Sequence, residues 1–277
     1  MMNRTATIDL VALDLDGTLL TTGEEISPRN RRAIAALLSA GIRVVIVTGR
    51  GIDTPLRIAR ELEIDSFPVI CCHGALTRDL ATGKTLGHIP VPLIYAKPII
   101  EFAESEQLPI AVYAEDHFWR LEGQEALMSD MTGPAWRSTP SFASLLRTPP
   151  TFIRFLGAEG AQAVQQRFGN LPLNFRIERW FEFVECVVLD RRAGKKQALA
   201  ELCRRFQIPR ERVMAIGDSP NDVPMLRWAG TGVVMGNALP EVRAMVPLTT
   251  GTNDEDGVAE AIERYVFGGG LGNARSA

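Results

Sequence analysis

Two carboxylates, Asp14 and Asp16, stand two residues apart where a short apolar run ends, and Gly17 follows them. At the end of a buried strand such a pair is unfavourable unless it binds a cation or acts as nucleophile and acid. The glycine permits a sharp turn that brings the Asp16 backbone inward. The pattern therefore predicts carboxylate chemistry or cation binding, although Asp-x-Asp alone is also a common fragment of turns and calcium loops.

A second acidic stretch, GDSPND at 217–222, follows another apolar run. Asn221 or Asp222 would serve as the cap of a following helix, but capping does not account for Asp218 as well. Open α/β sheets bind their ligands where parallel strands end. We therefore group this stretch with the first pair of aspartates.

Two further stretches suit a phosphate group. Thr48-Gly49-Arg50 ends a predicted strand, where a hydroxyl and free backbone N–H groups would contact phosphate oxygens. A simple turn explains the same tripeptide. Lys195 and Lys196 begin a predicted helix, where cations oppose the helix dipole, so that a nearby anion is indicated. A solvated surface pair is the alternative for the lysines.

Other chemically active residue types are sparse. The cysteines include no C-x-x-C pair, and the histidines show no metal-binding spacing such as H-E-x-x-H. These residues are Cys71, Cys72, Cys186 and Cys203, and His73, His88 and His117. We expect the thiols to be reduced and buried. The chemistry of this chain is therefore expected to depend on carboxylates.

The elements that position these residues form an alternating pattern. Apolar runs at 8–13, 42–47 and 68–72 indicate buried strands. Ser27 and Thr54 each precede a proline at the start of an amphipathic helix between these runs. Strand and helix alternate with short links, which predicts parallel strands joined by right-handed crossovers.

The middle of the chain departs from this pattern. A hairpin turn is expected at 79–84, and beyond it short strands alternate with helices such as 158–168. The aromatic residues of this segment include Tyr113, Phe118, Trp119, Trp136 and Trp180. In an α/β domain such residues more often belong to the core than to a ligand site.

The first pattern returns after this segment, with a strand expected over 212–216 and a last helix over 257–266. We therefore predict one discontinuous core domain, 1–84 and 190–277, interrupted by an inserted α+β domain at 85–189. The fold class is α/β, with a parallel sheet in the core.

The composition excludes several functions. The 277 residues carry a net charge of −3, which argues against a protein that coats nucleic acid or binds membranes through basic residues. The apolar runs are far shorter than the ~20 residues of a membrane span. The first eight residues are polar and show no signal peptide, so a cytoplasmic location is expected.

In this order and spacing the four stretches resemble the motifs of the haloacid dehalogenase (HAD) superfamily, and in detail those of its Cof-type phosphatases, subclass IIB. The matching segments are DLDGT at 14–18, TGR at 48–50, the lysine at 195, GDSPND at 217–222 and NDEDGVA at 253–259. The resemblance implies a Rossmann-like parallel sheet core with a cap domain inserted between the second and third motifs. It covers the insertion only in size and position.

The resemblance also implies a role for each residue. Asp14 would be the nucleophile that forms an aspartyl-phosphate, and Asp16 would protonate the leaving alkoxide and then deprotonate the attacking water. Asp14, the backbone carbonyl of Asp16 and Asp218 would hold Mg²⁺, which prefers oxygen ligands. Asp222 would support the metal site from outside the ligand set. The phosphoryl oxygens would be held by Leu15, Thr48, Gly49, Lys195 and Asn221.

Two positions depart from the family's pattern. Relatives usually carry lysine followed by glycine, whereas this chain has Lys195 followed by Lys196. The register of the motif selects Lys195 and leaves Lys196 as the alternative. His73 stands where relatives usually carry asparagine before glycine, near the site entrance, and we expect it to affect substrate fit.

The expected activity is Mg²⁺-dependent hydrolysis of a small phosphomonoester, such as a sugar phosphate. A second aspartate two residues after the nucleophile is the phosphotransferase pattern of the superfamily, so a dehalogenase is disfavoured. A sugar phosphomutase is the nearest alternative. A phosphometabolite-binding protein without catalysis is a more distant one, because binding alone does not require Asp16. The expected partner is a small phosphorylated metabolite, not nucleic acid or membrane, and the chain would be a monomer or homodimer.

Overall fold

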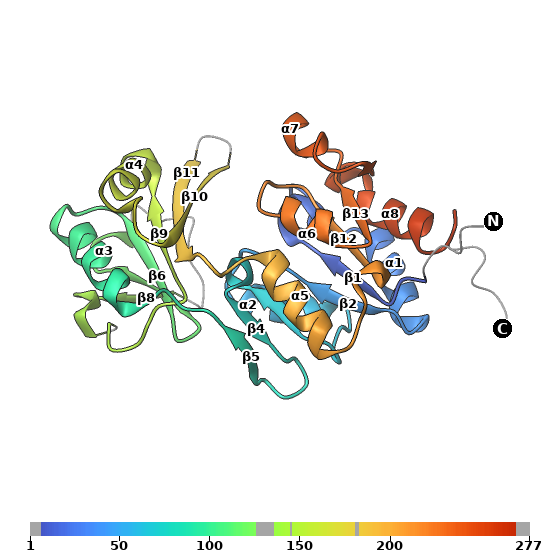
Figure 1. Cartoon of the computed structure of the whole chain (residues 1–277), viewed down its shortest axis with the longest axis horizontal. Coiled ribbons are helices and arrows are strands. Elements are labelled where there is room, and N and C mark those ends of the chain that lie inside the picture. Colours follow the sequence, from blue (N-terminus) through green and yellow to red (C-terminus); the bar gives the residue numbers. More distant parts are fainter. Residues whose placement is uncertain (1–6, 126–135, 145, 181–182, 270–277) are drawn as a thin grey trace. The chain divides into compact units, whose positions relative to one another are not determined.

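The computed structural model describes residues 7–125, 136–144, 146–180 and 183–269 (Figure 1). The chain forms two compact units. The first unit comprises residues 1–50, 54–86 and 194–277, and the second comprises residues 51–53 and 87–193.

The divisions lie a few residues beyond the predicted ones at 84 and 190. β5 (Thr85–His88) starts within the first unit because it belongs to a sheet there. The turn after β11 (Phe183–Asp190) stays with the second unit. Residues 51–53 also group with the second unit, where the Ile52 amide donates a hydrogen bond to Tyr113 Oη at 3.0 Å.

A five-stranded parallel sheet forms the centre of the first unit, which confirms the predicted α/β core. In spatial order its strands are β14 (Leu248–Thr249), β13 (Thr231–Val234), β12 (Val213–Gly217), β1 (Leu10–Leu13) and β2 (Arg43–Ile46). β1 lies between β12 and β2, and every residue of β1 is buried. Burial on both faces explains why the run is almost continuously apolar.

The chain order in this sheet creates a switch point between β1 and β12. From β1 the chain continues to β2 on one side, whereas from β12 it continues to β13 and β14 on the other side. The connections therefore diverge at this point, which is where open α/β sheets bind ligands. The residues that directly follow the two strands are Asp14 and Asp218.

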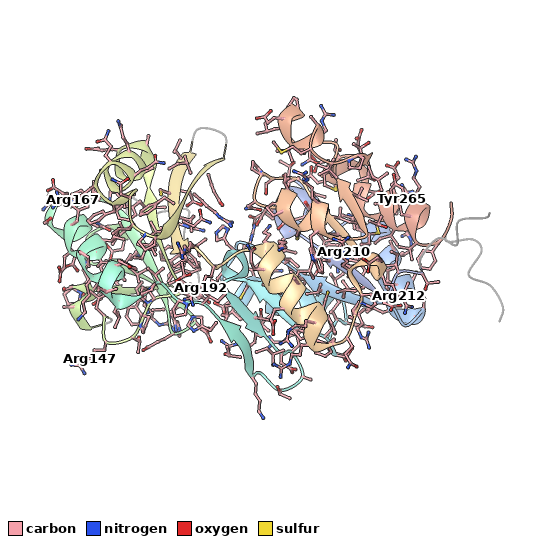
Figure 2. All side chains as sticks on the ribbon, viewed as in Figure 1. Arg147, Arg167, Arg192, Arg210, Arg212 and Tyr265 are labelled. Carbon is pink, nitrogen blue, oxygen red and sulfur yellow. The ribbon has the colours of Figure 1, made fainter. Side chains whose placement is uncertain are left out.

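Pairing at the amino end of β1 extends beyond the strand itself. The Asp9 amide donates to the carbonyl of Arg212 at 2.8 Å, and the Asp9 carbonyl accepts from the Arg43 amide at 3.0 Å. Arg212, labelled in Figure 2, also donates through Nε to the Thr7 carbonyl at 3.2 Å. These contacts fix the central strand, and with it the position of Asp14 at its other end.

The first long helix starts where the sequence pattern predicts. The Ser27 side chain accepts from the Asn30 amide at 3.1 Å and caps α1 (Pro28–Ser39). The Asn30 side chain then accepts from the Ala259 amide at 2.9 Å, which joins α1 to α8 (Gly257–Tyr265). The other helices of this part are α2 (Asp53–Glu61), α5 (Lys195–Arg205), α6 (Val223–Trp228) and α7 (Pro240–Arg243).

The strand expected at 68–72 lies outside the parallel sheet. β3 (Val69–Cys71) meets the end of β2 through one parallel bridge between Val47 and Ile70, and the chain then reverses. Three residues and an immediate reversal leave no length for a parallel ladder. β3 instead forms a three-stranded sheet with β4 (Leu76–Arg78) and β5. The predicted hairpin turn at 79–84 joins the last two strands and is confirmed.

The second unit contains a six-stranded mixed sheet and two long helices, which confirms the α+β insertion. In spatial order the strands are β10 (Leu173–Trp180), β11, β9 (Phe152–Leu156), β6 (Ile110–Ala114), β7 (His117–Leu121) and β8 (Trp136–Thr139). Neighbours are antiparallel except β7 and β8. α3 (Leu93–Ser105) and α4 (Gly157–Phe168) bury apolar side chains against this sheet.

Aromatic side chains of the second unit form a connected group. Tyr113 is fully buried and stacks on Phe152, with ring centroids 5.1 Å apart. Phe118 lies edge-on to Tyr113 at 4.7 Å and stacks on Trp136 at 4.9 Å. The expected core role is therefore confirmed for Tyr113. The side chain of Trp180 lies outside the described residues.

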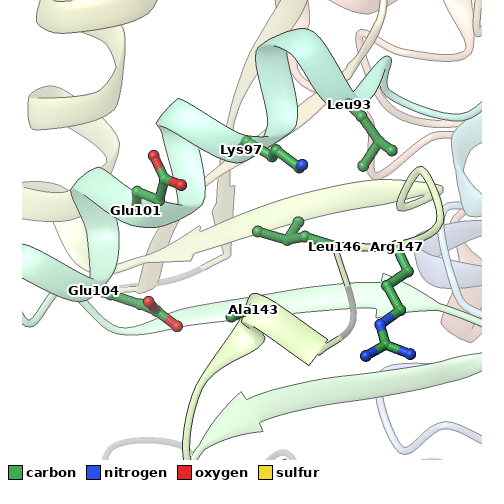
Figure 3. Close-up of a pocket in the computed structure, with 7 residues that line it drawn as sticks. All are labelled: Leu93, Lys97, Glu101, Glu104, Ala143, Leu146 and Arg147. Atoms are coloured by element: carbon green, nitrogen blue, oxygen red, sulfur yellow. The ribbon is translucent and has the colours of Figure 1, made fainter.

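A hollow of about 490 Å³ lies beside α3 in the second unit (Figure 3). Its lining carries charges of both signs and consists of Leu93, Lys97, Glu101, Glu104, Ala143, Leu146 and Arg147. Glu104 accepts from the Phe142 amide at 2.7 Å, so this carboxylate already has a partner. None of the lining residues belongs to the motifs of the sequence.

Two expectations about the whole chain can be compared with the described residues. The four cysteines form no disulfide bond and are buried, as predicted. Within the described ranges, no helix combines the length and apolar character that crossing a bilayer requires.

Candidate active site

Asp14 continues directly from β1 and is almost fully buried. Its amide donates to the Ile216 carbonyl at 3.1 Å, so its backbone still pairs with β12, and its residue surface is 3% exposed. The chain then turns at Gly17, where φ is +71°. A Cβ on Gly17 would lie 2.5 Å from Asp218 Oδ2. Glycine at this position thus provides both the turn and the close approach of the two loops.

A buried lysine joins two aspartates of the site. Lys195 is the first residue of α5 and is 2% exposed. Its Nζ donates to Asp14 Oδ1 and to Asp222 Oδ1, both at 2.7 Å. Charge-assisted bonds of this length are strong. Lys196, the alternative from the sequence, is only half-buried. The ammonium group that contacts the predicted nucleophile is therefore that of Lys195.

The carboxylates outnumber the cation in this buried cluster. Burial, followed by repulsion from Asp222, raises the pKa of Asp14 well above its usual range, against the opposing effect of Lys195. The same two causes raise the pKa of Asp218 to about 7. Burial alone would lower the pKa of Lys195, but Asp14 and Asp222 raise it. One ammonium group therefore leaves excess negative charge, which a further cation would compensate.

Asp222 precedes α6, yet its side chain stabilises the loop before it instead of the helix. Asp222 Oδ2 accepts from Ser219 Oγ at 2.8 Å, from the Ser219 amide at 3.1 Å and from the Asp218 amide at 3.3 Å. The helix start receives no side-chain capping bond from Asp222. Helix capping therefore does not explain this residue, which fixes the loop that carries Asp218.

Three aspartates form a group that could hold a metal ion. Asp14, Asp218 and Asp222 each offer a carboxylate oxygen, and these atoms lie within 4.8 Å of one another. Thr18 Oγ1 orients Asp218 by donating to its Oδ1 at 3.1 Å. An all-oxygen donor set with excess negative charge fits Mg²⁺ better than zinc. Asp222, predicted outside the ligand set, belongs to this group.

Thr48 and Gly49 follow β2, the neighbour of β1. Thr48 is fully buried, and its Oγ1 accepts from the Arg50 amide at 3.1 Å. His73 packs against this loop: its amide donates to the Thr48 carbonyl at 3.1 Å, and a Cβ on Gly49 would lie 2.6 Å from its ring. His73 therefore restricts the position of the predicted phosphate loop.

The turn that carries His73 also contacts the start of α5. Cys72, His73 and Gly74 all have positive φ, at +53°, +56° and +89°. Such a conformation is unfavourable for residues other than glycine. A Cβ on Gly74 would lie 2.3 Å from the Gly194 carbonyl carbon and 2.7 Å from the Lys195 nitrogen. One strained turn thus supports both stretches that the sequence assigned to phosphate.

Asp16 pairs with a different partner. Arg50 Nε lies 2.9 Å from Asp16 Oδ1 and 3.0 Å from Asp16 Oδ2, and Arg50 Nη2 donates to Asp16 Oδ1 and to Glu24 Oε1. About a quarter of each side chain of the Asp16–Arg50 pair is exposed. The two carboxylates of one motif therefore have different surroundings.

The predicted residues thus fall into two groups. Asp14, Lys195 and Asp218 lie together with Asp222, whereas the Thr48 hydroxyl accepts from the Arg50 amide and the Asn221 side-chain oxygen accepts from Ser219 Oγ. Leu15, next to Asp14, is fully buried.

Sequence reasoning missed the partners of the site carboxylates. Thr18, Ser219 and Arg50 stand inside the recognised motifs, so their position there was the available signal. Hydroxyl and guanidinium groups that stand among the acids of a motif would be expected to bind them. Glu24 carries no such signal in the sequence.

Comparison with known proteins agrees with this geometry. A family model of haloacid dehalogenase-like hydrolases matches residues 11–262. The pyridoxal phosphate phosphatase YbhA of Escherichia coli is 29% identical, over 94% of this chain and 100% of its own length. The phosphatase YwpJ of Bacillus subtilis is 31% identical, over 93% of this chain and 99% of its own.

A solved structure supports the same assignment. A haloacid dehalogenase-like hydrolase from Bacteroides thetaiotaomicron superposes with a TM-score of 0.79 at 29% identity, covering 93% of this chain and 99% of that chain. Its likeness extends through the first unit and the insertion. The chain therefore belongs to the haloacid dehalogenase-like hydrolases and is a phosphoric monoester hydrolase of that family.

Proposed function

We propose that this enzyme is a Mg²⁺-dependent phosphatase that hydrolyses small phosphomonoesters through an aspartyl-phosphate on Asp14. The observation that supports this most directly is the buried Asp14 carboxylate, bonded to Lys195 and adjacent to two further aspartates. A carboxylate in such a place can attack phosphorus and then be released by hydrolysis.

In the first step an Asp14 oxygen bonds to phosphorus while the bond from phosphorus to the leaving oxygen breaks. Lys195 holds Asp14 through Oδ1 and limits the rotation of the carboxylate. Mg²⁺, held by Asp14, Asp218 and the Asp16 backbone carbonyl, would supply the positive charge that a carboxylate needs to approach a phosphate dianion. Asp16 gives its proton to the leaving alkoxide.

In the second step water hydrolyses the aspartyl-phosphate. Asp16 takes one proton from the water, the new bond forms to phosphorus, and the bond from phosphorus to Asp14 breaks. Phosphate leaves, and both aspartates return to their starting states. The phosphoryl oxygens are held by the backbone of Leu15 and Gly49 and by the side chains of Thr48, Lys195 and Asn221.

The substrate is proposed to be a sugar phosphate or a similar phosphometabolite. A relative named for pyridoxal phosphate supports the inclusion of that compound among the candidates. We further propose that the second unit acts as a cap that excludes water during phosphoryl transfer.

The test is phosphate release from p-nitrophenyl phosphate, with Mg²⁺ and with a chelator, by the native enzyme and by Asp14→Asn. We expect turnover that requires the ion and falls by at least ~1,000-fold in the variant, because the amide is not a nucleophile. Circular dichroism checks that the variant is folded. A panel of phosphorylated metabolites then ranks substrates by kcat/KM.

Three outcomes would contradict the proposal. Activity that survives in Asp14→Asn would mean that another residue is the nucleophile. Transfer of phosphate between two positions of a sugar, with little free phosphate, would identify a phosphomutase. A folded native protein that binds phosphometabolites without turnover would identify a binding protein.

A further inference from the structure

Arg50 links a carboxylate of the site to a second acid further along the chain. Its guanidinium contacts both Asp16 oxygens, at 2.9 and 3.0 Å from Nε. Its Nη2 bonds to Asp16 Oδ1 and also to Glu24 Oε1, the latter at 2.7 Å. All three residues belong to the first unit. The side chain of Arg50 is therefore fixed between two carboxylates.

The Arg50 backbone is fixed as well. Its amide donates to Thr48 Oγ1 at 3.1 Å, and its carbonyl accepts from the Cys72 amide at 2.9 Å. These bonds tie the residue to the predicted phosphate loop on one side and to the strained turn on the other. The backbone bonds thus fix the position from which the Arg50 side chain extends, and the planar guanidinium group approaches Asp16 from a fixed direction.

The two Asp16 oxygens are not equivalent. Among the residues that the structure describes, Oδ1 receives hydrogen bonds from both Nε and Nη2 of Arg50, whereas Oδ2 receives only the longer contact from Nε. A carboxylic acid that keeps its carbonyl oxygen on the guanidinium can still carry a proton on the other oxygen. The arrangement therefore favours Oδ2 as the atom that gives and takes the proton.

The Asp16–Arg50 pair contributes little to the stability of the fold, so stability does not explain its presence. Each side chain of the Asp16–Arg50 pair is about a quarter exposed, and that of Glu24 is 71% exposed. Ion pairs that are partly exposed to solvent contribute little to the stability of the fold. Orientation is the larger benefit, because a fork that contacts both oxygens sets the plane of the carboxylate.

We propose that Arg50 is a positioning residue that holds the Asp16 carboxylate in the orientation for proton transfer, with Glu24 as the outer anchor of Arg50. This inference rests on the proposed function, in which Asp16 is the acid and base. It assigns a role to the last residue of the Thr-Gly-Arg stretch, and Arg50 itself does not contact the reacting phosphorus.

The test compares two substrates that differ in their leaving group. p-Nitrophenolate leaves without help from an acid, whereas the alkoxide of an alkyl phosphate requires a proton. Arg50→Gln is expected to lower kcat/KM for the alkyl phosphate by ~10- to 100-fold and for p-nitrophenyl phosphate by less than ~3-fold. The ratio kcat/KM reports the first phosphoryl transfer, so slow hydrolysis of the intermediate does not mask the difference.

A matched control and a graded variant sharpen the test. Arg29 forms a similar two-point pair with Glu263 in the same unit, at 3.2 and 2.7 Å. Arg29→Gln is expected to leave both substrates unchanged. Glu24→Gln removes the outer anchor of Arg50 and is expected to lower kcat/KM for the alkyl phosphate. The loss should be only ~2- to 5-fold, because Arg50 keeps its bonds to Asp16. Guanidinium ion added to Arg50→Gly should restore alkyl phosphate turnover in part.

Equal losses on both substrates would overturn the inference, because they would mean that Arg50 binds the phosphoryl group or supports the fold. Unchanged activity on both would overturn it as well. Phosphate release by the native enzyme distinguishes the failure of this inference from the failure of the proposed function. If it releases phosphate and Asp14→Asn does not, the phosphatase assignment stands whatever Arg50 does. If the native enzyme shows no turnover, both proposals fall.

Discussion

The buried cluster around Asp14 and the outer pair around Asp16 differ in almost every physical respect, although two residues of sequence separate the two aspartates. Asp14 is 3% exposed and bonded to a lysine that is 2% exposed. Asp16 pairs with a partly exposed arginine, which in turn bonds to the exposed Glu24. A single motif thus places one carboxylate in a buried cluster and the other in a partly exposed position at the edge of that cluster.

The difference teaches how one motif can supply two functions. The strand keeps Asp14 in the core because its backbone still pairs with β12, whereas the turn at Gly17 releases Asp16 from the sheet. A buried, ion-paired carboxylate suits a nucleophile that must not move. A partly exposed one suits a group that exchanges protons with substrate and water.

The largest expected effect comes from removing the cation of the buried cluster. Lys195→Met leaves Asp14 and Asp222, which lie beside Asp218, without their ammonium partner. We expect the free energy of unfolding of the metal-free enzyme to fall by about 3–5 kcal/mol. Phosphatase activity is expected to fall by more than ~100-fold. Chemical denaturation in chelator and p-nitrophenyl phosphate turnover measure the two quantities.

Lys196→Ala is the matched control for that variant. The neighbouring lysine is only half-buried, so we expect its loss to change the free energy of unfolding by less than ~0.5 kcal/mol. Equal losses from the two lysine variants would mean that the ammonium of Lys195 does not hold the cluster together.

A smaller effect concerns pH. The pKa of Asp218 is raised to about 7 by burial and by Asp222, whereas its value in the unfolded chain is near 3.8. At pH values between these two pKa values, the folded state binds more protons than the unfolded state. The contribution of Asp218 to the stability of the metal-free enzyme therefore falls as the pH rises. Asp218→Asn removes the effect. In chelator, the variant is expected to gain stability relative to the native enzyme from pH 5 to pH 8.

Thermal unfolding of both proteins across that pH range measures the difference. Added Mg²⁺ should stabilise the native enzyme more at pH 8 than at pH 5, because the ion competes with the proton. A stability difference between variant and native enzyme that stays constant with pH would show that Asp218 is already ionised in the metal-free fold.

The smallest effect is expected at the strained turn that supports the buried side of this comparison. His73→Asn places a residue that tolerates positive φ at +56°, but it also removes ring contacts with Gly49. These opposing effects should keep the change in the free energy of unfolding within ~1 kcal/mol. We expect the ranking of substrates to change. An unaltered kcat/KM profile over the metabolite panel would remove His73 from substrate selection.

Sequence alone predicted the buried half of the site better than the outer half. Asp14 and Asp218 could be grouped because each follows an apolar run, and parallel strands end at one edge of a sheet. The Arg50 contact with Asp16 depends on the conformations of two loops, and the hydrophobic periodicity of the sequence does not predict loop conformations. Glu24 has no motif at all, so only the structure could place it.

The fold shows the same division. The parallel core followed from strand and helix alternation, and the Ser27 cap from a local signal. β3 could not be assigned to its sheet, because a short apolar run is compatible with parallel or antiparallel pairing. The reversal that decides its pairing relies on positive φ at Cys72 and His73, which residue type disfavours.

The pairing of β1 with β12 sets the order in which the molecule can form during synthesis. Leu10 pairs with Arg43 of β2 and with Val213 of β12, so one side of the central strand can pair early, whereas the other side stays open until the chain beyond residue 213 has emerged. The second unit is almost continuous in sequence, from 87 to 193, and can fold earlier. Asp14, the proposed nucleophile, is thus synthesised early, whereas the loop that carries Asp218 and Asp222 is synthesised about 200 residues later.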